Sequence, residues 1–230
     1  LVLDSEVVGE LSNKIKKSAI ITDESCFYAE SGGQVGDKGI ISSENAEFKV
    51  TDTRKTPQGI FIHFGNVISG NFKIGNEVKL KIDSSLRELI KKNHSATHLL
   101  HAALRNNLGL HVAQRGSLVN ENKLRFDFSH NKQISSKQID TIQKEVTNII
   151  SNDCETQIDI KSQDEAIKQG AMALFGEKYG DEVRVVTLGE NNNKPYSIEL
   201  CGGTHVTNVQ NIKKFHIISE ESVSSGVRRI

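Results

Sequence analysis

The sequence is poor in aromatic side chains, methionine and proline. Its 230 residues include no tryptophan, one methionine and two prolines, and aromatic residues make up 5%. Any hydrophobic core must therefore be built mainly from isoleucine, valine and leucine. No apolar run approaches the roughly 20 residues that span a membrane, and no signal-peptide pattern begins the chain. A membrane protein is therefore not expected.

An excess of charge of one sign is also missing. The 29 lysines and arginines balance 29 aspartates and glutamates, which argues against a protein that holds nucleic acid by uniform basic charge. A local basic patch is compatible with this balance. Cys26, Cys154 and Cys201 are odd in number and scattered, so we expect free thiols in a reducing compartment, with Cys26 and Cys154 inert and buried.

The length and the two ends indicate a piece of a larger protein. A chain of 230 residues can form one large domain or two small ones. It begins with Leu1 rather than methionine and ends on Arg228-Arg229-Ile230 without the composition of a tail. We therefore interpret it as part of a longer cytoplasmic protein.

Residues 1–85 contain short β-like runs separated by Gly, Asn, Asp and Ser. Most runs alternate apolar and polar residues, as half-buried strands do, and Pro57-Gln58-Gly59 is typical of a hairpin turn. No helix is needed here, and several short strands at this spacing indicate a small sheet or barrel. The predicted strands lie at residues 19–21, 48–50, 60–64 and 78–82.

Helical periodicity begins near residue 85. Ser85 and Glu88 have the spacing of a capping box, and apolar residues then recur at helical intervals as far as Gly109, a typical helix stop.

Two further helices and several strands are predicted beyond Gly109. One helix starts after Ser135 or Ser136, and the other runs from the capping box of Ser162 and Glu165 to about Leu174. Residues 86–230 therefore indicate an α+β domain, with an antiparallel sheet and helices on one face. The predicted strands lie at residues 118–119, 124–128, 157–161, 183–188, 196–200 and 215–219.

Two pairs of metal-ligand side chains stand far apart in the sequence. His94 and His98 are four residues apart on the predicted helix, which places both imidazoles on one face about 6 Å apart. Cys201 and His205 follow a predicted strand, and the two glycines between them let the backbone turn sharply. A helical histidine pair is more often packed or solvated than metal-bound, but the two pairs together favour a metal. Nitrogen and sulfur ligands favour Zn²⁺ over Mg²⁺ or Ca²⁺.

Spacing alone does not decide which helix histidines bind. His101 lies three residues after His98 and seven after His94, so all three share a face. The other histidines are expected to be surface or hydrogen-bonded side chains; they are His63, His111, His130 and His216.

Four segments carry a combined pattern that is specific to one family. They are Phe27-Tyr-Ala-Glu-Ser-Gly-Gly-Gln-Val-Gly-Asp37, His94-Ser-Ala-Thr-His-Leu-Leu-His-Ala-Ala-Leu104, Gln114-Arg-Gly-Ser-Leu-Val119 and Cys201-Gly-Gly-Thr-His205. Together they resemble the editing domain of alanyl-tRNA synthetase and the free-standing alanyl-tRNA editing proteins. The segments occur in the family's order, and Ser225 to Ile230 resembles the family's exit from this domain. Nothing resembles an ATP-binding aminoacylation core, so ATP binding is expected only of a full-length synthetase.

The resemblance implies a fold and a set of site residues. The fold is α+β, with a Gly-motif β-barrel over residues 1–85 and a zinc-containing editing core with antiparallel sheet and helices over residues 86–230. Gln114 falls where the family has a pocket residue important for editing, and Arg115 keeps the charge of the Lys common at the next position. The implied zinc ligands are His94, His98, Cys201 and His205, without His101.

The glycine-containing loop Ser31-Gly32-Gly33-Gln34 has two interpretations. The resemblance implies that it faces the editing cleft and modulates it, together with Arg115 as part of the substrate cleft. The alternative is a tight turn inside the barrel, because adjacent glycines also permit a sharp change of direction.

The implied activity is hydrolysis of the ester that joins serine or glycine to tRNA(Ala), within the rest of the synthetase chain. A site that activates alanine cannot strongly exclude either, because one methyl is worth only about 1–3 kcal/mol. A polar pocket accepts serine and spares alanine, since alanine leaves buried polar groups unpaired. Gln114 and the Thr204 hydroxyl are the candidate catalytic contacts. Four protein ligands normally close a zinc site, so we favour a zinc that positions substrate over one that activates water.

Other functions stay open. The chain can also be interpreted as a free-standing trans-editing deacylase, or as a zinc-stapled tRNA-binding module without activity. A metallohydrolase of another substrate is disfavoured, because the general-base position of His-Glu-x-x-His holds Ser95. Basic patches for tRNA are each too small to bind RNA alone, so weak affinity is expected. They are Lys91-Lys92, Arg115, Lys123 with Arg125, Lys213-Lys214 and Arg228-Arg229.

Overall fold

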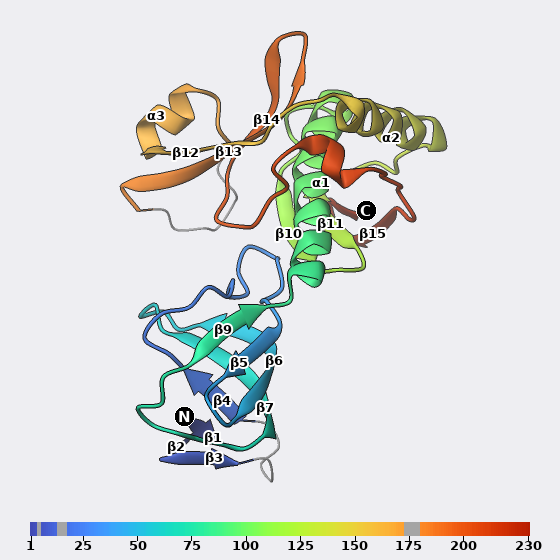
Figure 1. The fold of residues 1–230 in the computed structure, drawn as a ribbon. Coiled ribbons are helices and arrows are strands. Elements are labelled where there is room, and N and C mark those ends of the chain that lie inside the picture. The colour runs from blue at the N-terminus through green and yellow to red at the C-terminus, as the bar shows by residue number, and fades with distance from the viewer. Residues whose placement is uncertain (4–5, 13–17, 173–179) are drawn as a thin grey trace. The chain divides into compact units, whose positions relative to one another are not determined.

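The computed structural model describes residues 1–3, 6–12, 18–172 and 180–230 of the chain (Figure 1). It divides into two compact units, Leu1–Glu88 and Leu89–Ile230. Both are built from antiparallel sheets with few helices, which confirms the α+β class. Each unit has a hydrophobic core of its own, dominated by aliphatic side chains and phenylalanine.

The first unit is a β-structure, and no helix lies among its described residues before position 84. Burial alternates along its long central strands, as expected for a sheet with one face on a core. The seven-stranded sheet has the order β2-β1-β4-β7-β6-β5-β9, and β3 pairs with β8. The strands are β1 (Val2–Leu3), β2 (Glu6–Val7), β3 (Glu10–Ser12), β4 (Ser18–Ile21), β5 (Gly39–Ser42), β6 (Glu47–Lys55), β7 (Phe61–Ser69), β8 (Asn71–Lys73) and β9 (Lys79–Ile82).

The predicted hairpin turn between β6 and β7 is confirmed. The Gly59 N–H donates to the Thr56 carbonyl at 2.9 Å, and the Thr56 N–H donates to the Ile60 carbonyl at 2.9 Å. Gly59 has a φ of 91°, a value that glycine adopts without steric cost.

The predicted closed β-barrel is not confirmed. A barrel requires its edge strands to pair, and in the described part of the first unit β2 and β9 are the two unpaired edges of the sheet. The edge strand β2 and its neighbour β1 are each only two residues long, which leaves little backbone with which to close the sheet.

Helix α1 (Ser84–Leu108) carries the first ligand pair, and its start differs from the prediction. The Asp83 side chain, rather than Ser85, caps the helix, because its Oδ1 accepts from the Leu86 N–H at 3.1 Å. The end is as predicted, with Gly109 at a φ of 116° directly after the last helical residue.

In the second unit α1 packs between β11 and α2 in one aliphatic core. Helix α2 begins after Ser135, as predicted, with a capping box of Ser135 and Gln138, and the predicted capping box of Ser162 and Glu165 stands at the start of α3. The strand orders are β10-β11-β16-β15 and β12-β13-β14. The elements are β10 (Gln114–Val119), β11 (Leu124–Ser129), α2 (Ser136–Ser151), β12 (Gln157–Ser162), α3 (Gln163–Lys168), β13 (Glu182–Asn191), β14 (Lys194–Leu200), the 3-10 helix η1 (Val209–Ile212), β15 (Glu221–Ser224) and β16 (Val227–Arg229).

Three predictions for the second unit were wrong. It has two antiparallel sheets rather than one. Helix α3 ends at Lys168 and is followed by Gly170 at a φ of 85°, short of Leu174, which lies outside the described residues. Residues 215–219 form no strand, because the Ile217 N–H donates to the Gln143 side chain of α2 at 2.9 Å instead of to a sheet.

None of the helices in the described ranges combines the length and the apolar character that crossing a membrane requires.

Candidate metal centre

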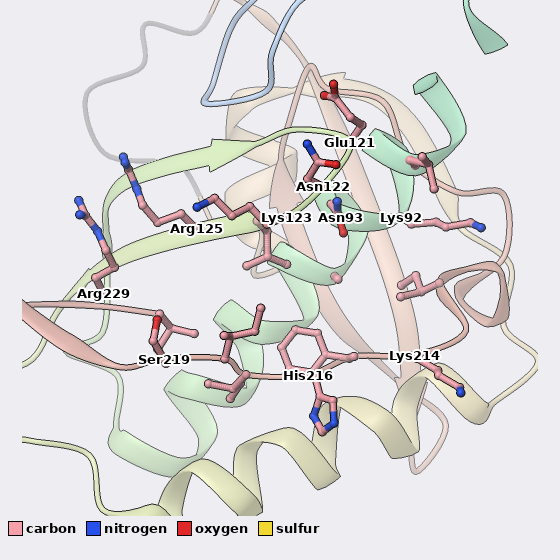
Figure 2. A pocket seen from close by; sticks show the side chains of 18 of the residues that line it. Lys92, Asn93, Glu121, Asn122, Lys123, Arg125, Lys214, His216, Ser219 and Arg229 are labelled. Carbon is pink, nitrogen blue, oxygen red and sulfur yellow. The ribbon is translucent and has the colours of Figure 1, made fainter. Parts of the chain in front are cut away.

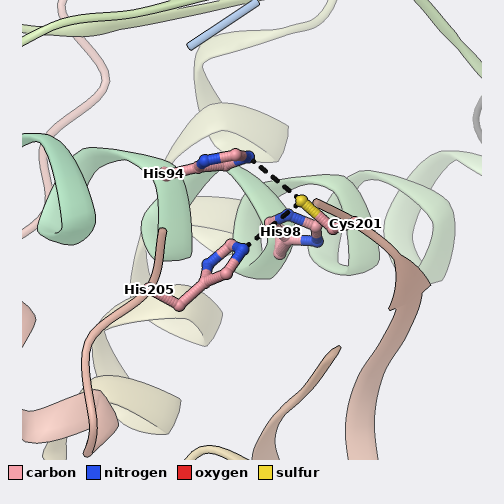
Figure 3. A group of neighbouring side chains, drawn as sticks. All are labelled: His94, His98, Cys201 and His205. Carbon is pink, nitrogen blue, oxygen red and sulfur yellow. Dashed lines mark hydrogen bonds between the residues drawn. The ribbon is translucent and has the colours of Figure 1, made fainter. Parts of the chain in front are cut away.

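The two predicted ligand pairs meet inside the second unit. His94 and His98 project from the buried middle of α1, four residues and therefore about one turn apart. Cys201 and His205 lie on the loop that follows β14. One ligand atom from each of the four side chains lies within 4.8 Å of all the others (Figure 3). The structure therefore assembles a cluster of three imidazoles and one thiol that can hold a metal ion.

The distances within the cluster fit one small cation. Cys201 Sγ lies 3.5 Å from His94 Nε2 and 3.4 Å from His205 Nε2. A tetrahedral ion with bonds of zinc length holds its nitrogen and sulfur ligands about 3.3–3.6 Å apart. The two distances from the thiol therefore match those between ligands of one such ion, and all four ligand atoms lie within 4.8 Å of one another.

Burial and charge favour a cation at this place. All four side chains are at most 6% exposed, and buried polar groups of this kind require compensation. Burial lowers the pKa of His205 to about 3. Burial raises the pKa of the Cys201 thiol, but the charges of His94 and His98 have the larger effect and lower this pKa to well below its usual range. Cys201 and His205 are therefore held in the deprotonated states that metal binding requires.

A buried carboxylate stands behind the cluster. Glu199 is 2% exposed, and its two oxygens lie 3.0 Å from His98 Nδ1 and 3.0 Å from His101 Nδ1. Burial raises its pKa, but the two histidines lower it more, so the carboxyl is ionised. Burial lowers the pKa of His98, whereas the charges of Glu199 and Cys201 raise it to about 10. His101 therefore turns its Nδ1 to Glu199, while His98 lies between Glu199 and the other candidate ligands.

The imidazole of His205 is oriented by a hydroxyl. Ser95 Oγ lies 3.2 Å from His205 Nδ1 and accepts the Val206 N–H at 3.1 Å. Such partners of the second ring nitrogen fix the tautomer and direction of a metal-ligating histidine. Ser95 and Glu199 thus supply outer contacts for His205 and His98.

Arg184 on β13 clamps the loop that carries Cys201. Its Nη1 donates to the Cys201 carbonyl at 2.6 Å and to the Gly203 carbonyl at 2.9 Å. Its own carbonyl accepts the Cys201 N–H at 3.0 Å. The loop is therefore fixed from the neighbouring strand on both sides of its first ligand.

The predicted catalytic residues take different places. Thr204 is half-buried between the two ligands of the loop. Gln114 is half-buried at the start of β10, opposite Phe128, and its side-chain amide makes no hydrogen bond with the described residues. Arg115 is exposed at a shift of register between Gln114 and Gly116. The catalytic roles stay predictions.

The loop Ser31-Gly32-Gly33-Gln34 belongs to the first unit and forms a tight turn. The Gln34 N–H donates to the Ser31 carbonyl at 2.9 Å, and the Ser31 N–H donates back at 3.2 Å. Gly32 and Gly33 have φ values of 57° and 85°, as the central residues of a two-residue hairpin turn require. The turn accounts for both glycines, and the place of the loop in a substrate cleft stays a prediction.

Asp37 gives the rest of this glycine-containing segment a structural role. Its Oδ2 accepts the Tyr28 N–H at 2.6 Å, its Oδ1 accepts from Arg87 Nε at 3.0 Å, and Arg87 Nη2 also contacts Oδ2. Gly36 lies so close to β6 that a Cβ there would be 2.2 Å from the Thr53 carbonyl oxygen. The segment is thus held by backbone contacts that only glycine permits.

The other cysteines and histidines are only partly as predicted. Cys26 is exposed and Cys154 half-buried, so the prediction of two buried thiols was wrong. Each remaining histidine has a hydrogen-bonding partner: Ser25 for His63, His130 for His111 and Gln143 for His216.

Three residues around the cluster were not predicted from the sequence: Ser95, Arg184 and Glu199. Glu199 carried a usable signal, because it stands two residues before Cys201 in a strand and therefore on the same face as that buried side chain. Arg184 and Ser95 carried none, since their contacts depend on which elements pack together.

Comparisons with known proteins show what the chain is related to. Residues 1–86 match the family of class II (A) tRNA synthetases, and residues 183–230 match the second additional domain of threonyl and alanyl tRNA synthetases. The alanine–tRNA ligase of Mesorhizobium japonicum is 47% identical over 100% of this chain and 26% of the relative. That of Parvibaculum lavamentivorans is 50% identical over 93% of this chain and 24% of the relative.

A third relative, the alanine–tRNA ligase of Rhizobium johnstonii, is 47% identical over 100% of the chain and 26% of its own length. The chain therefore spans about a quarter of the length of the curated relatives it matches. The first unit, in which the sequence analysis found no synthetase core, carries the class II match. These matches show that the chain is homologous, over its whole length, to a segment of the aminoacyl-tRNA synthetases that are alanine–tRNA ligases.

Proposed function

We propose that this chain is the editing module of an alanine–tRNA ligase, and that it hydrolyses the ester of Ser-tRNA(Ala) and Gly-tRNA(Ala). The observation that carries the proposal is the buried cluster of His94, His98, Cys201 and His205 in a segment homologous to these ligases. The rest of the synthetase chain is its proposed partner, because the aminoacylation site there would make the mischarged tRNA that this module hydrolyses.

The metal is proposed to be zinc. Three imidazole nitrogens and one thiolate form a donor set that suits zinc and is unattractive to magnesium or calcium. When bound, zinc supplies Lewis-acid polarisation and a fixed positive charge for orienting a substrate group. Four protein ligands normally complete its shell, so the proposed role is to position substrate.

The chain's own polar groups are proposed to select the amino acid. Gln114 has an uncommitted amide among the described residues, and Thr204 lies between two metal-ligand candidates. A serine hydroxyl can hydrogen-bond the Gln114 amide, whereas alanine would leave that amide unpaired at a cost of about 1–3 kcal/mol. This difference supports hydrolysis of Ser-tRNA(Ala) with Ala-tRNA(Ala) spared.

One observation favours a second candidate function. All four candidate ligands are buried within the range of the core side chains, with exposures of 3–6%. Closed four-ligand zinc sites are typically structural. A zinc-stapled tRNA-binding module without activity is therefore the alternative; a free-standing deacylase acting in trans would share the chemistry of the first proposal.

Serine release from purified Ser-tRNA(Ala) separates these functions. Wild type is expected to release serine from Ser-tRNA(Ala) faster than it releases alanine from Ala-tRNA(Ala). With Cys201→Ala, serine release is expected to be no faster than in buffer alone. Gln114→Ala should reduce serine release roughly 5- to 100-fold, the equivalent of one buried polar contact. Cys154→Ala, a half-buried thiol outside the cluster, is the matched control. Serine release by wild type no faster than by Cys201→Ala would leave only the structural alternative.

A further inference from the structure

A groove of about 520 Å³ lies in the second unit beside α1 (Figure 2). Its walls are the first half of α1, the turn between β10 and β11, and the segment after η1. Leu89, Lys92, Asn93 and Ala96 line it from α1. With about 3.6 residues per turn, these positions point away from the side of the helix that carries His94 and His98.

Cations from four separate segments outnumber the two carboxylates, Glu121 and Glu221, around this groove. Lys92 comes from α1, Lys123 and Arg125 from the β10–β11 hairpin, Lys214 from the segment after η1, and Arg229 from β16. Each belongs to a basic patch that is too small to bind RNA alone. The fold thus joins patches that are more than one hundred residues apart in sequence.

Three of these cations have no charge partner. Among the described residues, the ammonium groups of Lys92, Lys123 and Lys214 make no ion pair or hydrogen bond, and all three surround the groove. The arginines differ, because Arg229 donates to both oxygens of Asp127 at 2.7 and 2.9 Å and Arg125 lies 3.6 Å from the same carboxylate. The free positive charge of the groove is therefore carried by lysines.

The floor between the lysines is apolar. Leu124, Phe215 and Ile217 line it and pack against the core of the unit. Unpaired ammonium groups around an aliphatic and aromatic floor suit a polyanion with apolar faces, which describes ribose rings and bases between phosphates.

We propose that this groove binds the sugar–phosphate backbone of tRNA, with Lys92, Lys123 and Lys214 as its phosphate contacts. The inference rests on the proposed function, since it assigns that function's substrate a second contact surface. Because groove and metal cluster occupy different sides of α1, the groove contacts a part of the RNA other than the 3′-terminal nucleotide that carries the ester. The three lysines supply affinity and no base readout.

The test is the salt dependence of binding between the chain and a fluorescently labelled, uncharged tRNA(Ala) transcript, followed by anisotropy. Three phosphate contacts predict a slope of log affinity against log salt of about −2.1 to −2.7, so affinity falls roughly 20- to 40-fold between 50 and 200 mM salt. The triple variant Lys92→Gln, Lys123→Gln, Lys214→Gln is expected to lose most of this binding and to flatten the slope. Each single change should reduce the slope by about 1.

The matched control removes the same charge elsewhere in the unit. Lys137→Gln, Lys168→Gln, Lys194→Gln changes three exposed lysines that do not line the groove, and it is expected to bind RNA as wild type does. Circular dichroism of both triple variants verifies that each is folded. Equal loss in both variants, no loss in the groove variant, or no binding by wild type at 50 mM salt would overturn the proposal.

Two further arms separate this inference from its neighbours. If polyglutamate rather than tRNA binds in a manner that depends on the groove lysines, the groove serves an acidic polypeptide and the proposal fails. If wild type releases serine from Ser-tRNA(Ala) while the groove variant binds RNA normally, the groove proposal fails alone. If groove-dependent binding is found without serine release, the groove stands and the proposed deacylase activity fails.

Discussion

Replacing Glu199 by glutamine is expected to weaken metal binding without unfolding the second unit. The carboxylate is 2% exposed and faces the Nδ1 atoms of His98 and His101 at 3.0 Å each. A glutamine keeps the shape but has only one acceptor oxygen, so its NH₂ group must face one of the two imidazoles. It also removes the negative charge that favours a well-oriented, electron-rich His98.

The size of the effect follows from the place of Glu199 behind a candidate ligand. Loss of an outer-shell partner typically reduces metal affinity 10- to 100-fold, which corresponds to about 1.4–2.8 kcal/mol. This range matches the roughly 1.5–3 kcal/mol of one hydrogen bond to a charged group. Competition with a chromophoric zinc chelator at fixed pH measures the affinity directly.

Glu145 provides a matched control. Its carboxylate accepts from Asn106 at 2.8 Å, Asn107 at 2.6 Å and Tyr196 at 2.7 Å, away from the cluster. Glu145→Gln is expected to lower the thermal midpoint of unfolding and to leave zinc affinity unchanged. Zinc affinity of Glu199→Gln within threefold of wild type, or an equal loss in Glu145→Gln, would refute the account of Glu199.

Three further predictions concern the loop that carries Cys201, the metal ion and a buried histidine of the first unit. Arg184→Lys should shift the visible spectrum of the Co²⁺-loaded chain, because lysine cannot hold both the Cys201 and Gly203 carbonyls as Arg184 does. The control Arg105→Lys loses a similar clamp on Leu110 and Val112 and should leave the spectrum unchanged. Identical spectra in the two variants would count against the clamp. Zinc at 1,000 times its Kd stabilises the fold that binds it by about 4 kcal/mol, so chelation should lower the unfolding midpoint by roughly 8–16 °C, and a midpoint indifferent to chelator would contradict a buried metal. Burial lowers the pKa of His63, so the folded state resists protonation of this side chain. The free energy of unfolding should therefore fall by up to about 1.4 kcal/mol per pH unit below about pH 6.5. Urea unfolding at pH 7.5 and 5.5 should show a smaller loss of this free energy for His63→Gln than for wild type, and equal losses would exclude this role.

Local patterns in the sequence predicted the parts of the site that depend on local structure. The helix carrying His94 and His98 follows from its apolar periodicity, and Gly109 ends it for a backbone reason that is visible in the sequence. The start of α2 after Ser135 and the capping box at Ser162 were equally local. At the start of α1, Asp83 and Ser85 are both good caps, and spacing favoured the wrong one.

Contacts between distant segments could not be predicted in this way. Glu199 contacts His101, which lies 98 positions away in the sequence. Residues 215–219 have the alternation of a strand, but the Ile217 N–H donates to the Gln143 side chain instead of to a neighbouring strand. The convergence of Lys92, Lys123 and Lys214 on one groove likewise depends on how α1, the β10–β11 hairpin and the segment after η1 pack. Sequence patterns name such residues, and tertiary packing decides what they touch.

The central claim is that His94, His98, Cys201 and His205 hold one zinc ion, and the metal content of the purified chain tests it most directly. Elemental mass spectrometry of protein prepared without added metal should give about one zinc per chain for wild type and for the Cys154→Ala control. It should give close to none for His94→Ala, Cys201→Ala. Zinc retained by that double variant, or a wild type that holds no zinc even after equilibration with the metal, would contradict the account.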